Sequence, residues 1–318
     1  DGKDFFGDDA SAALKNLPAE LIEKVQIFDA QSEQSQFTGF NDGTTTKTIN
    51  IVTKNGMQNG QFGKVYAGYG YDDKYQAGGN ISFFDGDRRI SVIGMTNNIN
   101  VQNFAAEDIV GTMGGGGGRG GMPGGGRGGQ GGGGSAGDFL VRSSGGITQT
   151  HAFGLNYSDK WGKKVDVSGS YFFNKGINNT EKITNRQFLN EENIADEIYD
   201  ESSLSRSDNL NHRFNLRMEF KLDSMNSIML RPRLTIQQND GNSSTIGNTV
   251  FGGNLLNATN NSYLSNMDGL NFSNSLLWRH KFQKKGRTLS LDFTTAYAPK
   301  KGESTLQSIS GFYAAPNP

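Results

Sequence analysis

The segment Arg213-Phe214-Asn215-Leu216-Arg217-Met218-Glu219-Phe220-Lys221-Leu222 alternates polar and apolar side chains without a break. Successive side chains of a β-strand point to opposite faces of the sheet, so this segment predicts a strand with one apolar and one polar face. The segment 227–237 repeats the pattern, with Ile228 and Leu230 in the apolar set and Arg231 and Arg233 in the polar set. We therefore predict two neighbouring strands that share an apolar face.

The same period-two signal recurs along most of the chain. It predicts nine strands, at 61–71, 75–84, 88–97, 149–158, 164–174, 212–222, 227–237, 270–282 and 287–297. The third of these is the most weakly patterned. Strands of about ten residues have the length that a tilted transmembrane β-strand needs.

The lengths of the connections alternate as well. The short links are 85–87, 158–163, 223–226 and 283–286, and the long links are 98–148, 175–211 and 238–269, with 72–74 as an exception. Transmembrane β-barrels have short turns at one end and long loops at the other. We therefore predict an incomplete antiparallel up-and-down barrel in a mainly β protein. Alternation alone also fits a soluble sheet with one wet face, which stays as an alternative.

Two further features of the predicted strands bear on a membrane location. Aromatic side chains near strand ends are typical of the interfacial girdle of a barrel; they are Tyr69, Tyr71, Tyr157, Trp161, Trp278 and Tyr297. Pro232 removes one ladder donor from the middle of a strand, so less regular pairing is expected there, which a bulge would accommodate.

Composition excludes several classes of protein. The chain has 318 residues, a formal net charge of −1 and an apolar fraction of 34%. No run approaches the roughly 18 apolar residues that a transmembrane helix needs. Cysteine is absent, which excludes disulfide scaffolds, thiolate metal sites and cysteine nucleophiles. The balanced charge gives no reason to expect a nucleic acid as partner.

Both ends of the sequence suggest a piece of a longer protein. Asp1-Gly2-Lys3-Asp4 is not the basic start of a signal peptide. Nine is an odd number of strands for a bacterial barrel, and we predict no closing strand before Pro316-Asn317-Pro318. We therefore expect the natural protein to be longer at both ends.

Residues 1–56 have a different residue pattern, with short helical stretches as well as strands, and are predicted to form a small mixed module. Residues 57–318 are predicted to form the barrel part. Short helical stretches are expected at 11–16 and 19–23, and strands at 24–28 and 46–54. Between the two strands we expect a polar loop, 29–45, that holds Phe37-Thr38-Gly39-Phe40.

Several segments invite a chemical interpretation, and a plain one is preferred for each. The Gly-rich stretch 111–137 contains Arg119 and Arg127; a flexible loop is preferred over an RNA-binding segment. The acidic run from Glu191 to Glu201 is interpreted as a solvated loop, with a calcium site as the alternative. His151, His212 and His280 are scattered over three strands, which favours membrane-interface positions over a metal site. No nucleophile or acid–base pattern supports an enzyme, and no cofactor is expected.

The arginines of the polar face are the candidate site. Arg213, Arg217, Arg231 and Arg233 lie on neighbouring predicted strands and on one face. They would either line a path for anionic solutes or form salt bridges with Glu219 and with acids of the N-terminal module. The salt-bridge role is the preferred interpretation, and substrate contact is the alternative.

The N-terminal module carries a family resemblance. Lys24-Val25-Gln26-Ile27-Phe28, the loop with Gly39, and Ile49-Asn50-Ile51-Val52-Thr53-Lys54 resemble the last half of the plug of TonB-dependent outer-membrane receptors. The nine strands resemble the first part of that family's barrel, and the match is closest to its SusC-like branch. The energy-coupling box, the first plug strands and the later barrel strands of the family are not in this sequence.

The resemblance implies a function in addition to a fold. It implies energised uptake across the bacterial outer membrane of a small molecule or oligosaccharide, or of an iron chelate. The implied partners are membrane lipid, a TonB-type energy-coupling protein acting on the full-length protein, and a surface lipoprotein. A non-transporting barrel or surface adhesin that binds ligands through long loops is the alternative.

Overall fold

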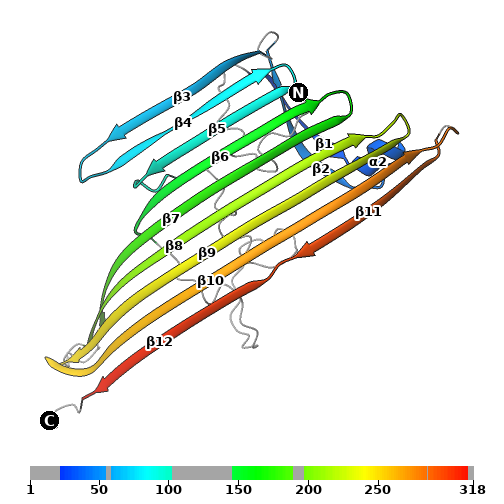
Figure 1. The fold of residues 1–318 in the computed structure, drawn as a ribbon. Helices are drawn as coiled ribbons and strands as arrows, with labels where there is room; N and C mark the ends of the chain where they lie inside the picture. Colours follow the sequence, from blue (N-terminus) through cyan, green and yellow to red (C-terminus); the bar gives the residue numbers. More distant parts are fainter. Residues whose placement is uncertain (1–21, 55–58, 102–144, 189–196, 285, 314–318) are drawn as a thin grey trace.

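The computed structural model describes residues 22–54, 59–101, 145–188, 197–284 and 286–313. These residues form twelve β-strands and one short helix, so the protein is mainly β as predicted. The strands belong to two separate sheets, a two-stranded one near the N-terminus and a ten-stranded one (Figure 1).

The N-terminal module is a β-hairpin with a helix in its connection. β1 (Ile22–Gln31) pairs antiparallel with β2 (Thr45–Thr53), which confirms both predicted strands. The connection predicted as a loop contains α2 (Glu33–Thr38). Ser32 caps this helix by accepting a hydrogen bond from the Ser35 N–H, and Gly39 ends it with φ at 77°, a left-handed value that glycine adopts without strain. The helix expected at 19–23 is wrong for its last residues, because β1 begins at Ile22; the stretch 11–16 lies outside the described residues.

The large sheet is an antiparallel meander in chain order. Its strands are β3 (Asn59–Tyr69), β4 (Tyr75–Asp85), β5 (Arg88–Asn97), β6 (Ile147–Trp161), β7 (Val165–Phe188), β8 (Glu197–Lys221), β9 (Asn226–Phe251), β10 (Asn254–Lys281), β11 (Thr288–Tyr297) and β12 (Lys300–Phe312). All nine predicted strands are present. Within the described residues the sheet stays open, with β3 at one edge and β11 and β12 at the other.

β11 and β12 together occupy one strand position. Both pair with β10, and the register continues unchanged from Tyr297 opposite Phe272 to Lys300 opposite Gly269. Pro299 lies at the break, where its carbonyl still accepts a hydrogen bond from the Leu270 N–H at 3.0 Å. The nine predicted strands therefore omit β12. Residues 300–312 are polar on both faces over most of their length, so they gave no alternation to detect.

Two of the three predicted long loops are strands. β7, β8, β9 and β10 extend far beyond their predicted ends, and β9 and β10 meet at the tight turn Gly252-Gly253. The links predicted at 175–211 and 238–269 are therefore wrong over most of their length. Residues 197–201 of the acidic run lie in β8, and the rest of that run lies outside the described residues, as does the Gly-rich stretch 111–137.

The physical reason for these misses is that the extensions are polar on both faces. Serine, threonine and asparagine dominate them, so apolar and polar residues do not alternate there. Backbone ladders and cross-strand side-chain hydrogen bonds hold these residues, such as the one between the Ser203 and Thr245 hydroxyls at 3.0 Å.

Pairing is irregular beside Pro232, as expected, but without a bulge. Ladder pairing between β8 and β9 pauses after Asn215 opposite Arg233 and resumes at Met218 opposite Leu230, in the same register. On its other side Pro232 lies opposite Asn274 of β10 in an unbroken register. The missing donor therefore interrupts the ladder locally without shifting it.

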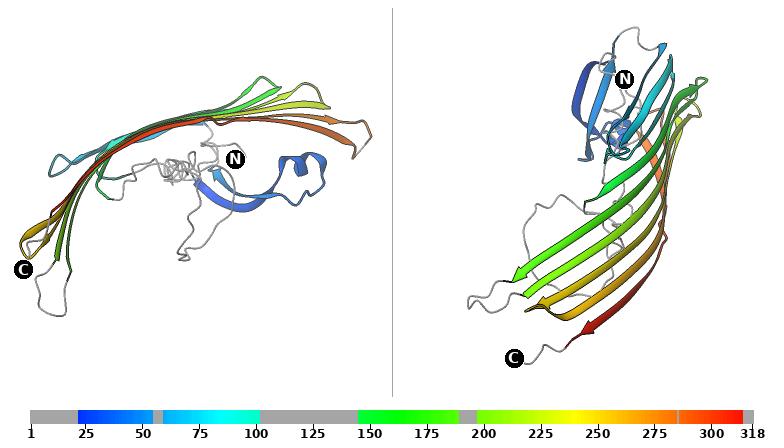
Figure 2. Two further views of the ribbon diagram at one scale, coloured as in Figure 1. Left: turned by 90° about the horizontal axis from the view of Figure 1, so that it is seen from below. Right: turned by 90° about the vertical axis from the view of Figure 1, so that its left-hand side faces the viewer.

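The sheet is one curved layer, and the N-terminal module lies on its concave side (Figure 2). Most of the buried apolar side chains are on the concave face, mainly over β4 to β7: Phe84, Ile93, Met95, Ala152, Phe172 and Met229. The concave face is therefore partly apolar over these strands. The weak alternation of β5 has the same cause: Ile90 and Val92 lie on one face and Ile93 and Met95 on the other, so both faces are apolar.

Candidate functional site

The four predicted arginines lie together on the concave face of β8 and β9. Arg213 lies opposite Thr235, and Arg233 lies opposite Asn215. The unchanged register across Pro232 brings Arg217 opposite Arg231. The sequence therefore identified a group of neighbouring basic side chains on one face, although they come from two separate strands.

Carboxylates neutralise part of this basic face. Arg217 Nη2 lies 3.4 Å from Glu219 Oε2, which is one of the salt bridges expected from the sequence. Lys221 Nζ lies 2.6 Å from Asp166 Oδ2 on the neighbouring strand β7. Basic side chains still outnumber acidic ones here, and guanidinium groups bind carboxylates and phosphates well. The concave face is therefore suited to anionic groups.

The N-terminal module contacts this face through α2. The Phe37 ring lies 5.3 Å from the Arg279 guanidinium and 5.3 Å from Lys281 Nζ, in two cation–π contacts. Gln34 Nε2 donates a hydrogen bond to Ser290 Oγ. Arg279, Lys281 and Ser290 share the concave face of β10 and β11 with the arginines. We name these contacts of Gln34 and Phe37 with the sheet the α2 contact.

The sequence missed the α2 contact, although one signal for it was available. Arg279 and Lys281 have the same parity as the polar face of the predicted strand 270–282, so their face was predictable. Phe37 is an aromatic side chain in a polar connection, but nothing in the sequence indicated which strand it meets. That pairing joins residues about 240 positions apart and depends on how the sheet curves.

The other predicted plug residues lie in the β1–β2 hairpin. Val25 pairs with Ile51 and Ile27 pairs with Ile49, so these four side chains form two cross-strand pairs. Asn50 Nδ2 donates to Gln26 Oε1 at 2.8 Å across the same hairpin. The backbone of Thr53 lies opposite Ile22, Lys54 follows the end of β2, and Gly39 ends α2.

Asp42 stabilises the turn that follows α2. Its carboxylate accepts hydrogen bonds from the Ser32 hydroxyl and from the Thr44 N–H, while its own N–H donates to Ser35 Oγ. These hydrogen bonds, that from Ser32 first, lower the pKa of Asp42 below its ordinary value of 3.8. A carboxyl with a lowered pKa in the folded state contributes stability above its unfolded pKa and loses it as the pH falls through the folded value.

We therefore expect the turn at residues 39–45 to loosen only below about pH 4. Hydrogen–deuterium exchange of this segment, corrected for intrinsic rates, should stay protected from pH 7 to pH 4 and rise below that. In Asp42→Asn the segment should be less protected at neutral pH and show no such dependence. Equal pH profiles for the two proteins would contradict the role of Asp42.

The convex face of the sheet is apolar and exposed. Its outward side chains include Phe214 and Leu216 of β8 and Leu276 of β10. On β11, Leu291 is 58% and Phe293 is 64% exposed. The outward positions from Leu270 in β10 to Phe282, the residue after its end, extend over roughly 40 Å at about 3.3 Å per residue. With a tilt of about 40°, this band is roughly 30 Å tall, similar to the hydrocarbon core of a membrane.

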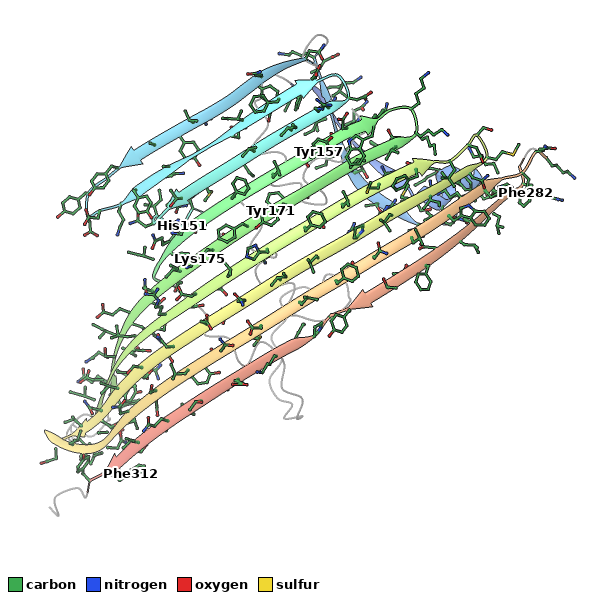
Figure 3. The ribbon with its side chains drawn as sticks, in the orientation of Figure 1. His151, Tyr157, Tyr171, Lys175, Phe282 and Phe312 are labelled. Atoms are coloured by element: carbon green, nitrogen blue, oxygen red, sulfur yellow. The ribbon has the colours of Figure 1, made fainter. Side chains whose placement is uncertain are left out.

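Polar residues bound the apolar band at the end away from the short turns. His151 lies opposite Lys175, next to the aromatic pair formed by Phe153 and Phe173 (Figure 3). Beyond this row the outward positions are mixed: Asp208 lies directly opposite Asp240, and exposed aliphatic side chains such as Leu204 and Ile246 stand among polar ones. The extended parts of β7 to β10 therefore differ from the band in the character of their outward face.

The histidines make side-chain contacts within the sheet. His151 Nδ1 lies 2.9 Å from the Thr96 hydroxyl, His212 Nδ1 lies 2.8 Å from the Tyr171 hydroxyl, and His280 Nδ1 lies 2.8 Å from Asn226 Oδ1. His151 and His280 lie near strand ends, whereas His212 lies in the interior of β8, away from the expected interface position. In the described part of the chain, no group of three or more His, Cys, Asp or Glu side chains has the arrangement of a metal site. Among the residues described, no helix has the length and hydrophobicity to span a membrane.

Comparisons with known proteins leave the chain without an assigned family. No protein-family model matches it. No curated protein matches it either. The function therefore has to be argued from the two faces of the sheet and from the module on its concave side.

Proposed function

We propose that this chain is part of a TonB-dependent outer-membrane receptor of bacteria, which takes up a nutrient such as an oligosaccharide or an iron chelate. The supporting observation is the single curved sheet with an exposed apolar band on its convex face and a polar surface with an attached module on its concave face. A soluble protein rarely exposes a contiguous apolar surface of this extent. In a membrane that surface lies against lipid, and the cost of its exposure disappears.

In this proposal each face has a separate role. The convex side chains contact acyl chains, and the concave side chains line a water-filled path. The module of residues 22–54 obstructs the path as a plug, held by the α2 contact. A periplasm-spanning coupling protein supplies the force that displaces it. Substrates with anionic groups fit the basic surface around Arg213 and Arg231.

A second candidate function is a non-transporting barrel or adhesin. The observation that favours it is the length of β7, β8, β9 and β10, whose polar ends project well beyond the apolar band. Such projections suit binding of a partner at the cell surface, including a surface lipoprotein. Uptake assays in cells with and without the coupling protein distinguish the two functions: loss of ligand accumulation without the coupling protein supports the receptor, and unchanged binding supports the adhesin.

The lipid-facing assignment is testable by cysteine accessibility, since the sequence has no cysteine of its own. Single cysteines replace the outward residues Leu216, Met218 and Phe220 or the inward residues Asn215, Arg217 and Glu219, in cells that produce the protein. A water-soluble maleimide applied to permeabilised cells should label the inward set at least about tenfold faster, because acyl chains exclude it from the outward set. Equal labelling of the two sets would refute the membrane assignment and favour a soluble β-rich module.

A further inference from the structure

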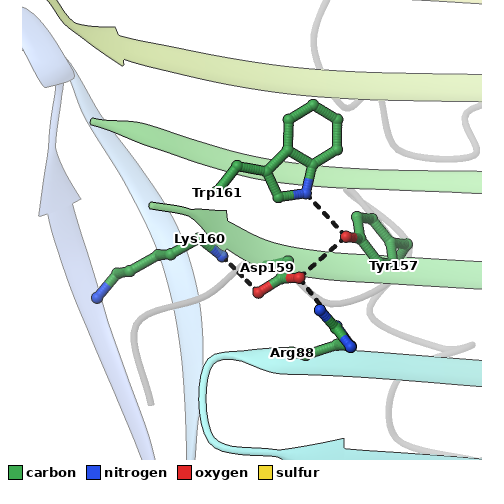
Figure 4. A network of polar contacts seen from close by, with 5 residues as sticks. All are labelled: Arg88, Tyr157, Asp159, Lys160 and Trp161. Atoms are coloured by element: carbon green, nitrogen blue, oxygen red, sulfur yellow. Dashed lines mark hydrogen bonds and ion pairs between the residues drawn. The ribbon is translucent and has the colours of Figure 1, made fainter. Parts of the chain in front are cut away.

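Four side chains form a connected polar group on the convex face, where β5 begins and β6 ends (Figure 4). Arg88 Nε donates to Asp159 Oδ2 at 3.0 Å, and the Tyr157 hydroxyl donates to the same oxygen at 3.1 Å. Trp161 Nε1 donates to the Tyr157 hydroxyl at 2.9 Å. We name this set of Arg88, Tyr157, Asp159 and Trp161 the β5–β6 cluster.

The members of the β5–β6 cluster differ sharply in exposure. The Asp159 side chain is only 9% exposed, whereas that of Arg88 is 58% exposed. Trp161 is 51% exposed. The buried carboxylate therefore acts as an internal acceptor that fixes the direction of Arg88. Among the side-chain nitrogens of Arg88, Nε alone has a hydrogen bond to another described residue, and the side chain is more than half exposed, so its terminal amino groups can donate to a ligand.

The surroundings of the cluster combine positive charge with an apolar surface. Lys163 and Lys164 lie in the turn that follows β6, whereas Lys160 points to the concave face and forms an ion pair with Asp87 at 3.4 Å. On the other side along β6, the outward side chains Phe153 and Leu155 are 40% and 38% exposed. A ligand with an anionic head and an apolar tail therefore meets a complementary surface along one strand.

We propose that the β5–β6 cluster binds the phosphate headgroup of a membrane phospholipid, with an acyl chain lying along Leu155 and Phe153. The terminal amino groups of Arg88 donate to the phosphate oxygens, for which guanidinium geometry is well suited. Trp161 lies at the headgroup level, where amphipathic aromatic side chains are favoured. Asp159 is a positioning residue that holds Arg88. This proposal rests on the lipid-facing assignment of the convex face.

Phospholipid is favoured over free phosphate because of the exposed apolar side chains next to the cluster. Free phosphate would contact only the Arg88 guanidinium. The neighbouring carboxylates of Asp159 and Asp87 weaken the attraction between that guanidinium and a phosphate. A phospholipid adds the burial of an acyl chain to the same charge-assisted hydrogen bonds. The two sources of phosphate are therefore expected to differ strongly in affinity.

The test uses Trp161 as its own reporter. The sequence has two tryptophans, so Trp278→Phe leaves Trp161 alone. The protein in detergent micelles is titrated with phosphatidylglycerol that carries brominated acyl chains, which quench tryptophan on contact. Arg88→Gln should raise the lipid fraction needed for half-quenching about tenfold, the loss expected for charge-assisted hydrogen bonds. Arg88→Gln combined with Asp159→Asn should show the same rise without leaving a buried, unpaired carboxylate.

Arg89→Gln is the matched control. Arg89 is the next residue of β5, points to the concave face and lies 5.1 Å from the Phe84 ring. Its replacement removes the same charge and should leave quenching unchanged. Equal quenching in the parent protein and both Arg88 variants would overturn the headgroup site but leave the lipid-facing assignment intact.

Two other outcomes have separate meanings. If brominated lipid quenches Trp161 in no variant, the convex face does not contact lipid, and the proposed function fails together with the site. If inorganic phosphate at matched concentration relieves the quenching, the site binds phosphate without regard to the lipid, and the assignment to phospholipid is overturned.

Discussion

Replacement of Leu216 by arginine is expected to destabilise the protein in its membrane by about 2–4 kcal/mol. Leu216 lies on the convex face near the middle of the apolar band, opposite Gly169 of β7. An arginine there has to reach the interface with its charged end or draw water into the bilayer. Urea unfolding in lipid vesicles, compared with the parent protein, measures the loss.

Thr294→Arg is the matched control for Leu216→Arg. Thr294 lies on the concave face of β11, where its hydroxyl donates to Asp292 at 3.4 Å. A new arginine at this position has water and a carboxylate beside it, so we expect a change within about 0.5 kcal/mol, as for an ordinary surface substitution. Equal losses for the two variants would show that the two faces do not differ in environment, which contradicts the lipid-facing assignment.

Removal of the Phe37 ring is expected to loosen the module from the sheet. Phe37→Ala abolishes both cation–π contacts with Arg279 and Lys281, which together are worth about 1–2 kcal/mol. A single cysteine in place of Ser290, which α2 contacts through Gln34, reports the docked state. Its labelling by a thiol reagent should become about 5–30-fold faster in Phe37→Ala, following the change in the docked population.

Phe40→Ala provides the control for this experiment. Phe40 lies three residues further along the same connection, and its side chain is 72% exposed. Its loss removes a ring of the same size without a described contact to the sheet, so labelling should stay at the parent rate. Unchanged labelling in Phe37→Ala would mean that the α2 contact does not hold the module.

The sequence predicted strands well wherever the two faces differ. β8 is the clearest case: Arg213, Arg217 and Glu219 face one side and Phe214 and Leu216 the other, and the structure keeps that separation. The module strands were found for the same reason. Their ends were less accurate, because alternation weakens where a strand passes beyond the apolar band.

Alternation weakens or disappears where both faces of a strand have the same character. The polar extensions of β7 to β10 and the whole of β12 looked like loops, although backbone pairing in one register holds them. β5 was predicted at its observed bounds, 88–97, but from a weak pattern, because Val92 and Ile93 make both of its faces apolar. Alternation along one strand detects a difference in polarity between its two faces, and it gives no signal where the two faces are alike.

The candidate site divides in the same way. Strand parity was sufficient to gather the four arginines on one face. The α2 contact joins segments far apart in the chain, and no periodicity reveals which strand a lone Phe37 meets. The β5–β6 cluster also depends on register, since Arg88 reaches Asp159 only because β5 and β6 pair as they do.

The sequence by itself determined the class of structure and the two faces of its sheet, because a period of two fixes the direction of each side chain before any folding partner is known. Only the tertiary structure decided how far each strand runs, which strands bring charged residues together, and that the module lies on the concave side. Those features depend on pairing register and sheet curvature, which arise from contacts between residues distant in the chain.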